Sequence, residues 1–560
     1  MNLLSGFGDI AFNATSAGGT FTTGGAANIG SVTGTDVAAS SSNVSIKADV
    51  LSFAAGTTLN TSGTVVMEPL STSFGSAVST ANVAMNGISG LRIGKSGNTA
   101  NIGIDRALSV AGPVSLYGGS INSAYNIDLT TGDTLTVNNS GSSLFSGVIS
   151  GTGASLSKLG AGVLTLTGTN TYTGGTSLDA ASTLVVGNGT TVGALGTGNI
   201  VNNGVLSFKQ SDAMTIADVI SGSGIVKQEG SGTLTLSNTN SYAGGTQINA
   251  GTLAISTDRN LGAVPASVTP DNISLNGGTL QFTTGFTTLH PNRGITLAGN
   301  GTLSTDASVL VNYAGVIAGT GGLTKSGSGT FTLTNAQTHT GTTTVSGGVL
   351  SVGDGSNTTA ALGANSISIG TGATLNFNHS ADVTVANAIG GAGALNKVDT
   401  HTLTLTGVNS YAGATDTGSA GAVVYTNNAA PATSGFTGSG AVTIEPATAS
   451  FASALGANYT YATTLTGLTL GKAGNLTDMT VDSLVNIAGP ITLYAPHITL
   501  NNGNISTLGG QTYNGAVILG ANTTLSSTGG GDITLGGTVN GAKTLVVNTT
   551  GATTFTGAVG

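Results

Sequence analysis

Short runs in which every second residue is apolar recur along the chain. In four of these runs two large apolar residues flank one threonine: Leu164 and Leu166, Leu234 and Leu236, Phe331 and Leu333, Leu403 and Leu405. A period of two places the apolar side chains on one face of a β-strand and threonine on the other. Glycine interrupts every window of about eleven residues that has helical spacing, so the pattern predicts strands and no helix.

Each of these runs belongs to a longer unit that occurs four times. The unit consists of a lysine, a glycine turn, the apolar and threonine alternation, an asparagine, an aromatic residue and a glycine pair. Its first copy, Ala154–Thr176, reads ASLSKLGAGVLTLTGTNTYTGGT, and the other copies begin near Lys227, Lys325 and Lys397. The pair Gly174 and Gly175 permits a sharp corner, after which a new strand begins. Strands and corners in this order predict a parallel β-solenoid.

A larger unit occurs twice. Thr64–Ile121 matches Ala441–Ile498 without a gap, 377 positions later, and 20 of the 58 positions are identical. This match indicates a duplication. We therefore expect a solenoid start at 1–63, the first copy at 64–121, a solenoid with four lysine-led repeats at 122–416, the second copy at 417–498 and an uncapped end at 499–560.

The composition narrows the class of protein. The chain has 560 residues, of which 92 are glycine, 6% are charged and 4% are aromatic. An average soluble domain has about 25% charged residues, and most enzymes and nucleic-acid binders need more charge than this chain has. The net charge is -9, without a basic cluster, which argues against nucleic acid or an anionic membrane as partner. Hydrophobic residues at 39% supply enough apolar surface for a folded chain.

The chain has no cysteine, which excludes disulfides and thiolate metal sites. It also lacks an apolar run of about 18 residues, so we expect no membrane-spanning helix. The start MNLLSGFGDI has no Lys or Arg for the charged region of a signal peptide. We therefore expect either that the export information has been removed or that the chain is a segment of a longer protein.

Three motifs suggest ligand chemistry, but each has a structural interpretation. Ser89–Ser96 (SGLRIGKS) differs from a phosphate-binding loop at Ser89, and Ala473 takes the place of Ser96 in the duplicate, so we interpret Gly94 and Gly97 as corners. The segment Gly529–Leu535 (GGGDITL) resembles a calcium-binding nonapeptide repeat but occurs once. The threonine alternation suggests ice binding, but we expect corners and inserted segments to interrupt a long regular strip.

The remaining candidates are charged or titratable side chains. The five histidines, which lack the spacing of metal ligands, are His290, His339, His379, His401 and His497. His339 takes the position that the other copies give to Tyr172, Tyr242 and Tyr411, so we interpret it as a replacement for an aromatic residue. We expect Glu68 to pair with Lys95 and Glu445 with Lys472, as structural salt bridges. We expect the lysines of the four units, Lys158, Lys227, Lys325 and Lys397, to face solvent beside turns. The sequence thus predicts no catalytic, cofactor-binding or metal site, and no cofactor.

The core of the lysine-led unit, GTLTLxxxNxYxGGT, resembles the autotransporter-associated β-strand repeat of exported bacterial passenger domains. The duplicated unit, with IGKSGN and AGPVSLYGGSI, and the tail GGQTYNGAVILGANTTL are similar to modules of filamentous-haemagglutinin-like adhesins. The resemblance implies an all-β fold, a single elongated right-handed parallel β-helix (β-solenoid). It also implies an adhesin stalk or matrix fibre that is exposed on a Gram-negative cell or shed from it, and no catalysis.

We therefore predict a non-enzymatic, extracellular structural or adhesive solenoid at the bacterial outer surface. It would be a segment of a giant surface adhesin or a subunit of an extracellular filament or biofilm matrix. Two alternatives stay open: a carbohydrate-active β-helix enzyme or carbohydrate-binding module, and an ice-binding solenoid.

The expected partners follow from this reading. The end TTFTGAVG resembles Ser142–Ser150 and neither end has a polar cap, so we expect copies to associate end to end into filaments. A host or neighbouring-cell surface and polysaccharide are the other expected partners. We expect neither nucleic-acid binding nor membrane insertion.

Overall fold

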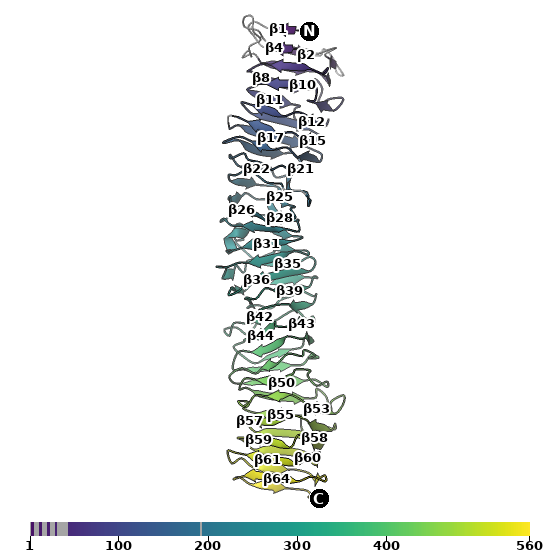
Figure 1. Cartoon of the computed structure of the whole chain (residues 1–560), viewed down its shortest axis with the longest axis vertical. Coiled ribbons are helices and arrows are strands. Elements are labelled where there is room, and N and C mark those ends of the chain that lie inside the picture. The colour runs from purple at the N-terminus through teal and green to yellow at the C-terminus, as the bar shows by residue number, and fades with distance from the viewer. Residues whose placement is uncertain are drawn as a thin grey trace. The chain divides into compact units, whose positions relative to one another are not determined.

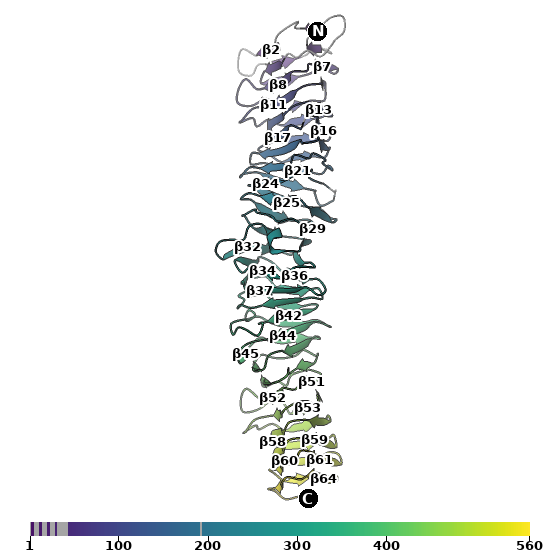
Figure 2. The same ribbon diagram turned by 90° about the vertical axis from the view of Figure 1, so that its left-hand side faces the viewer.

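The structure is a computed structural model that describes residues 2–4, 10–13, 20–22, 28–30, 43–130, 132–190 and 193–560. The chain divides into two compact units: unit 1 comprises Met1–Ser267 and Asp271–Leu280, and unit 2 comprises Val268–Pro270 and Gln281–Gly560. Each unit is a β-solenoid of short parallel strands stacked coil on coil (Figure 1, Figure 2). The predicted all-β solenoid class is confirmed, although much of the predicted start at 1–63 lies outside the described residues.

Unit 1 winds its strands into sheets in which each strand pairs in parallel with strands of the neighbouring coils. One sheet contains β2 (Ile10–Asn13), β5 (Val44–Lys47), β8 (Thr64–Glu68), β11 (Gly90–Ile93), β14 (Val114–Gly118), β17 (Thr134–Asn139), β20 (Ser155–Leu159), β22 (Thr176–Leu178), β24 (Ile200–Asn202) and β27 (Ile220–Ser221). Another contains β9 (Val78–Ser79), β12 (Ile102–Ile104), β15 (Ile121–Ser123), β18 (Ser143–Phe145), β21 (Val163–Leu166), β23 (Thr183–Val186), β25 (Val205–Phe208), β28 (Ile225–Gln228), β30 (Thr246–Ile248) and the unit 1 residues of β32 (Thr269–Leu275). Four smaller groups are β1 (Asn2–Leu4), β4 (Asn28–Gly30), β7 (Thr57–Asn60) and β10 (Val83–Asn86); β3 (Thr20–Thr22) and β6 (Val50–Ser52); β13 (Leu108–Val110), β16 (Ile127–Leu129) and β19 (Ile149–Ser150); β26 (Met214–Ile216), β29 (Thr233–Leu236) and β31 (Thr252–Ile255).

Unit 2 is built in the same way. One sheet contains β34 (Thr288–Leu289), β37 (Leu310–Tyr313), β40 (Thr330–Leu333), β42 (Val349–Val352), β44 (Thr374–Phe377), β47 (Ala394–Lys397), β49 (Thr415–Asp416), β51 (Gly435–Thr437) and β54 (Thr460–Tyr461). Another contains β45 (Val383–Val385), β48 (Thr402–Leu405), β50 (Ala422–Thr426), β52 (Ala441–Glu445), β55 (Leu468–Leu470), β58 (Ile491–Leu500), β60 (Gln511–Leu519), β62 (Ile533–Leu535) and β65 (Thr553–Phe555), with β53 (Leu455–Ala457), β56 (Met479–Val481) and β63 (Val539–Asn540) beside them. The remaining strands of this unit are β35 (Arg293–Leu297) with β38 (Ile317–Gly319); β36 (Gly301–Thr305), β39 (Leu323–Ser326), β41 (Thr343–Val345), β43 (Ile367–Ile369) and β46 (Ile389–Gly391); and β57 (Val485–Ile487), β59 (Asn504–Thr507), β61 (Thr523–Ser527) and β64 (Leu545–Thr549).

The alternation in the sequence produces the core. In β21 the side chains of Leu164 and Leu166 are buried, and Thr165 between them is only partly covered. The next coil places Leu184 beside Leu164 in register, so apolar residues stack on apolar residues inside the coil. Each fully buried residue of this kind contributes roughly 1.5 to 3 kcal/mol, which is opposed by the entropy of ordering the chain. The predicted inward face is confirmed at all four runs, and the threonine between the apolar residues is partly covered in three of them, whereas Thr332 in β40 is buried.

The duplicated unit folds alike in both places. Strands β8, β9, β12, β13 and β14 recur 377 residues later as β52, β53, β56, β57 and β58. A buried asparagine recurs with them: Nδ2 of Asn98 donates to the carbonyl of Tyr117 at 2.7 Å, and Nδ2 of Asn475 donates to that of Tyr494 at 2.9 Å. The internal hydrogen bonds are therefore duplicated with the sequence.

Helix is nearly absent from the described residues. The one helical turn described is the 3₁₀ segment η1 (Asp258–Leu261), which is capped at Thr257. Strand β33 (Thr279–Phe282) follows it and includes residues of both units. No helix among the described residues has the length and apolar character that crossing a membrane requires.

Corner glycines generate the first testable prediction. Gly175 has φ of 93°, and an added Cβ would overlap the carbonyl oxygen of Asn199 in the next coil. Gly87 has φ of 67°, but a Cβ there would meet nothing within 4 Å. We expect Gly87→Ala to cost about 1 kcal/mol of local stability from backbone strain, and Gly175→Ala at least about twice as much, since two coils must separate. Hydrogen exchange of β10 and β22 would measure both effects, and equal losses would contradict the close-approach argument.

Candidate functional site

In the four lysine-led units, buried polar side chains occupy the same points of the repeat, although the residue type can differ. The first is the asparagine before the aromatic residue. In the first lysine-led unit, Oδ1 of Asn170 accepts from the amide of Ile149 at 2.8 Å, and its Nδ2 donates to the carbonyl of Ala194 at 2.7 Å. These partners lie in the coils before and after, so one side chain joins three coils. Gln337 has this position in the third unit and accepts from the amide of Ile317 at 2.6 Å.

The aromatic position lies two residues further on and is fully buried. The hydroxyl of Tyr172 lies 2.6 Å from that of Thr176, four residues later, and the same contact recurs at 2.8 Å and 2.7 Å in the second and fourth units. In the third unit Nε2 of His339 lies 2.9 Å from the hydroxyl of Thr343. The prediction that His339 replaces a tyrosine is confirmed. Burial raises the pKa of Tyr172 to about 12 and lowers the pKa of His339 below its usual value.

The lysine position corrects an expectation. Lys158, Lys325 and Lys397 were expected to face solvent, but each is at most 1% exposed. The ammonium of Lys325 donates to the carbonyls of Ser326, Gly327 and Gly347 at 2.7, 3.1 and 3.1 Å. The glycine turn leaves these carbonyls without strand partners, and the buried cation satisfies them.

The second lysine-led unit has a different residue, Gln228, at the lysine position. Lys227 is on the outer face and only partly covered, whereas Gln228 is buried. Nε2 of Gln228 donates to the carbonyls of Gly230 and Gly232 at 3.0 and 2.9 Å, as the lysines do in the other units. The position therefore needs a long side chain with N–H donors, whether charged or neutral.

Burial sets the protonation of these lysines. It lowers the pKa of Lys158 and of Lys325 to about 8, and the charge of Asp179 opposes the shift at Lys158. At Lys397 burial also lowers the pKa, against the effect of the neighbouring Asp399. The interior of the solenoid thus contains cations that release a proton more readily than a surface lysine does.

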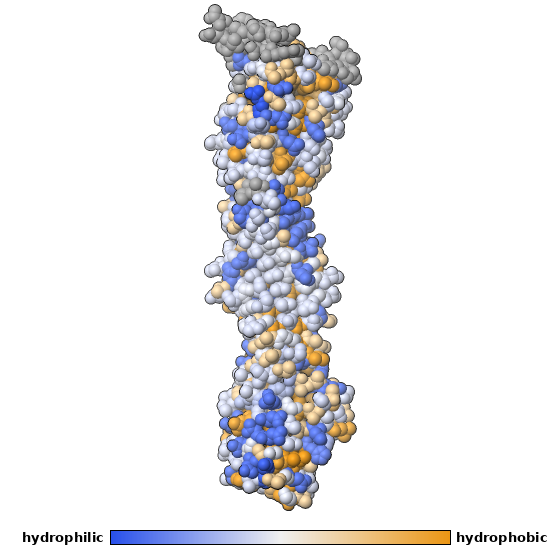
Figure 3. Space-filling view, turned by 45° about the vertical axis from the view of Figure 1, so that its right-hand side comes forward, coloured by the Kyte–Doolittle hydropathy of each residue, from blue (hydrophilic) through white to orange (hydrophobic). Residues whose placement is uncertain are grey.

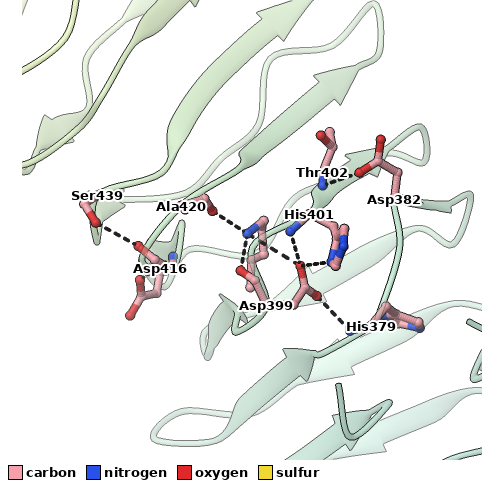
Figure 4. A network of polar contacts seen from close by, with 10 residues as sticks. His379, Asp382, Asp399, His401, Thr402, Asp416, Ala420 and Ser439 are labelled. Atoms are coloured by element: carbon pink, nitrogen blue, oxygen red, sulfur yellow. Dashed lines mark hydrogen bonds and ion pairs between the residues drawn. The ribbon is translucent and has the colours of Figure 1, made fainter. Parts of the chain in front are cut away.

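Around Lys397, unit 2 has a polar network that sequence spacing did not reveal (Figure 4). Its ammonium donates to the carbonyls of Asp399 and Ala420 at 2.5 and 2.7 Å and lies 3.7 Å from Oδ1 of Asp399. The Asp399 carboxylate accepts from the backbone amides of His379 and His401, each at 2.8 Å. Nδ1 of His401 lies 3.8 Å from the same carboxylate.

Two further aspartates flank this network (Figure 4). Oδ1 of Asp382 accepts from the amide of Thr402 at 2.8 Å, and Oδ1 of Asp416 accepts from that of Gly418 at 2.9 Å. Against the effect of burial, the charges of Asp399, Asp382 and Asp416 all raise the pKa of Lys397. Since backbone amides bind at least one oxygen of each carboxylate, the arrangement fixes turns around a buried cation.

The predicted salt bridges form with other partners. Oε1 of Glu68 lies 2.9 Å from Nζ of Lys47, and its Oε2 pairs with Arg92. Lys95 instead donates to the carbonyl of Leu70 at 3.3 Å. Burial disfavours the charged form of Glu68, but the two cations outweigh it and lower its pKa. The predicted Glu68–Lys95 pair is therefore wrong: Lys47 lies in register with Glu68 on the adjacent strand, and Arg92 reaches Glu68 from the position opposite Val66.

The duplicate of this cluster lacks both cations. Val424 and Thr469 stand 377 residues after Lys47 and Arg92. Glu445 accepts from the hydroxyl of Thr426 at 3.3 Å, and no ion pair joins it to Lys472 in the described part of unit 2. The predicted Glu445–Lys472 pair is wrong as well.

The other sequence candidates have structural roles. Gly94 and Gly97 of the phosphate-loop-like segment have φ of 81° and 86°, as expected of corners. In GGGDITL, Oδ1 of Asp532 accepts from the amide of Ala552 at 2.7 Å. Across the described ranges, no group of three or more His, Asp or Glu side chains is placed to hold a metal ion.

The outer surface of unit 2 carries a regular column that was expected to be interrupted. Nine residues lie side by side in register on successive coils, and all are partly or fully exposed. They are Thr384, Thr404, Val424, Thr443, Thr469, Thr492, Thr512, Thr534 and Thr554. We call these residues the threonine column. The expectation that corners and insertions break such a strip is wrong here, because the extra residues are accommodated in turns and leave the strands in register.

The rest of the surface is mixed. On the face in Figure 3, apolar residues form separate patches between polar ones. The most exposed large apolar side chains include Leu476 at 72%, Leu310 at 64% and Leu484 at 59%. Singly exposed side chains of this kind are usual for soluble proteins. The threonine column is thus the most regular feature of the described surface of unit 2.

The buried lysines generate a prediction about pH. The folded-state pKa of Lys325, about 8, is below its unfolded value of 10.5, so its contribution to stability is full above pH 10.5 and is lost as pH falls through 8. Relative to Lys325→Gln, the wild-type coil should gain about 1 to 2 kcal/mol between pH 7 and pH 9.5. Hydrogen exchange of 323–345 would measure this gain. The control Lys227→Gln, on the outer face, should show none, and an equal gain there would contradict the prediction.

His339 gives a second prediction about pH, at acid values. Since burial lowers its pKa, the folded state resists protonation and the unfolded state does not, so stability falls as pH drops below 6.5. His339→Tyr, which restores the residue of the other units, should remove up to about 2 kcal/mol of this loss between pH 6.5 and 5. Hydrogen exchange of 337–345 at the two pH values would test it. His497→Tyr, at an exposed site, is the control, and unchanged acid sensitivity in His339→Tyr would refute the assignment.

Comparison with known proteins agrees with the repeat described above. A model of the passenger-associated-transport-repeat family matches residues 156–186, 227–255, 323–352 and 395–423. The adhesin BmaC autotransporter of Brucella suis biovar 1 (strain 1330) is 33% identical over 337 residues, covering 54% of this chain. The chain spans 10% of the length of that relative. No solved structure matches the chain. The four lysine-led units, as their resemblance to the autotransporter-associated repeat predicted, are members of the passenger-associated-transport-repeat family.

Proposed function

We propose that this chain is a segment of the passenger of a bacterial surface adhesin, located outside the cell, and that it binds through its outer face without catalysis. The repeat family and the similarity to an autotransporter adhesin support the class of protein. The observation that carries the proposal is the threonine column of unit 2, in which Thr443, Thr469, Thr492, Thr512 and Thr534 present outward hydroxyl groups on successive coils.

The column has the properties of a multivalent binding surface. Each hydroxyl both donates and accepts hydrogen bonds, and each methyl group adds a small apolar contact. Threonine is stiff about χ1, so holding it in one rotamer on binding costs little entropy. Neighbouring strands place the groups about 4.8 Å apart, and many weak contacts at one spacing add up to avidity. A glycan-coated cell surface offers hydroxyl partners in comparable number.

The polar network supports binding over catalysis. A typical glycoside hydrolase needs two carboxyl groups that are free to reach the substrate. Asp399 accepts one backbone amide on each oxygen and neighbours the buried ammonium of Lys397. Incubation with a polysaccharide panel and assay of new reducing ends would test the carbohydrate-active alternative.

The threonine column also favours a second candidate, ice binding, for which a regular row of threonines is suited. The neighbouring outward positions differ from a second threonine row: Ala441, Gly467, Pro490 and Gly510 lie two residues before successive column members. These four positions give the column no second threonine row on that side, and we favour adhesion. Thermal hysteresis of the purified chain would reveal ice binding.

End-to-end association into filaments or a biofilm matrix is a finer part of the proposal. It draws on the general tendency of stacked strands to pair at open edges. Light scattering over a range of concentrations would test it, and a monodisperse monomer at high concentration would argue against it.

The adhesive face generates a mutational prediction. Beads coated with the chain should bind cultured cells, and Thr443→Val, Thr469→Val, Thr492→Val and Thr512→Val together should reduce binding at least about threefold, since hydroxyls are lost without change of shape. Val424 already occupies one position of the column, so the variant should fold.

The matched control is another outward row of unit 2. Thr302, Thr324 and Thr344 lie in register on β36, β39 and β41, and the triple change to valine there should leave binding unchanged. Equal loss from both variants, or no binding by the wild-type chain, would count against the assigned face.

A further inference from the structure

Unit 2 contains a cavity of about 270 Å³ beside the long connection between β42 and β43. Its lining is mainly apolar and includes Val352, Ile367, Phe377, Val383 and Val385, together with alanines of the connection. Cavities of about 150 Å³ with such linings already admit a benzene-sized molecule. This cavity is large enough for one or two fused rings.

One titratable side chain, His379, lines this cavity and is 1% exposed. Its Nε2 lies 2.9 Å from the carbonyl oxygen of Ala360, which can only accept, so Nε2 carries the proton and Nδ1 is an acceptor. Nδ1 is buried and has no hydrogen-bond partner. The ring lies on the side away from Asp399, which binds the backbone amide of the same residue (Figure 4).

An unpaired buried acceptor costs stability unless a ligand or water satisfies it. His339 also has a buried Nδ1 without a partner, but His339 is not among the residues that line the cavity. His379 therefore combines an unused acceptor with adjoining apolar space, and because Nδ1 is covered in this structure, a ligand reaches it only after a small movement of the imidazole ring.

The equivalent coil of unit 1 has other residues at the positions of His379 and Val383. Gln210 takes the position of His379, and its Nε2 donates to the carbonyl of Gly193 as His379 donates to that of Ala360. Met214 takes the position of Val383, at the start of β26 and β45 respectively. The longer methionine would fill part of the space that valine leaves, and other lining positions also differ, such as Ile216 at the position of Val385.

We propose that this cavity binds a small, uncharged, mainly apolar ring compound with one hydrogen-bond donor, such as a phenol or an indole, whose O–H or N–H donates to Nδ1 of His379. The aliphatic side chains and Phe377 supply apolar contact, and the unpaired Nδ1 favours molecules that carry a donor. Thr384, at one end of the threonine column, also lines the cavity, but the proposal does not depend on the adhesive function.

Fluorine NMR titration of the full chain with para-fluorophenol and para-fluorotoluene tests the proposal. Both probes should bind saturably at one site per chain. Val383→Met, which copies unit 1, should weaken both at least about tenfold by filling the cavity. Val398→Met, the same change at a side chain that is 46% exposed, is the control and should alter neither affinity.

His379→Phe keeps a ring of similar shape and removes the acceptor. It should lower the affinity for the phenol relative to the toluene by about 3- to 10-fold, the net value of one hydrogen bond. The absence of saturable binding by either probe to the wild-type chain would overturn the proposal, and so would unchanged binding in Val383→Met. An unchanged phenol-to-toluene ratio in folded His379→Phe would overturn the role of Nδ1. If His379→Phe fails to fold, Val383→Met and its control still decide whether the cavity binds.

Discussion

In-register parallel stacking of coils is the constraint on which the rest of this structure depends. Each strand takes its hydrogen bonds from the coils before and after, so the backbone is satisfied along strands, whereas some corner carbonyls, such as those of Gly160, Gly230 and Gly327, take side-chain donors. The interior must therefore contain donors as well as apolar stacks. Asn170, Lys158, Gln228 and Lys325 meet this need at fixed points of the repeat by donating to carbonyls of corners and adjacent coils. The repeat motif is thus a set of corner hydrogen bonds between which Leu and Val fill the core.

Local features of the sequence predicted the strands, the corners and the tyrosine position, because each depends on residues a few places apart. The lysine position was missed although a local signal was present. Leu156 and Lys158 are two residues apart on β20, and the same alternation assigns Lys158 to the inner face. In the second unit it assigns Val226 and Gln228 to the inner face and Lys227 to the outer. The expectation that a charged residue faces solvent was wrong at Lys158, because the strand period already places this residue on the inner face.

Contacts between coils were beyond prediction from the sequence for a different reason. Whether Glu68 meets Lys47 and Arg92 or Lys95 depends on the number of residues in each coil, which varies with the turns. For the same reason, the sequence did not predict the hydrogen bond between Asp399 and the amide of His379, twenty positions earlier, or the threonine column. Register between coils is set by where insertions are accommodated, and composition does not reveal this.

Stacking also determines where such a protein can acquire function. Outward residues are free of the corner constraint, so a column such as Thr443, Thr469 and Thr492 can be selected for binding without altering the core. An inward residue that donates a hydrogen bond to a corner carbonyl can be replaced only by a residue that keeps this donor. His379 meets that condition, because its Nε2 preserves the hydrogen bond made by Gln210 in unit 1 while its second nitrogen is released for another partner. Since shorter neighbours, such as Val383, leave space beside it, a structural position can become a binding site through a few substitutions, with that corner hydrogen bond intact.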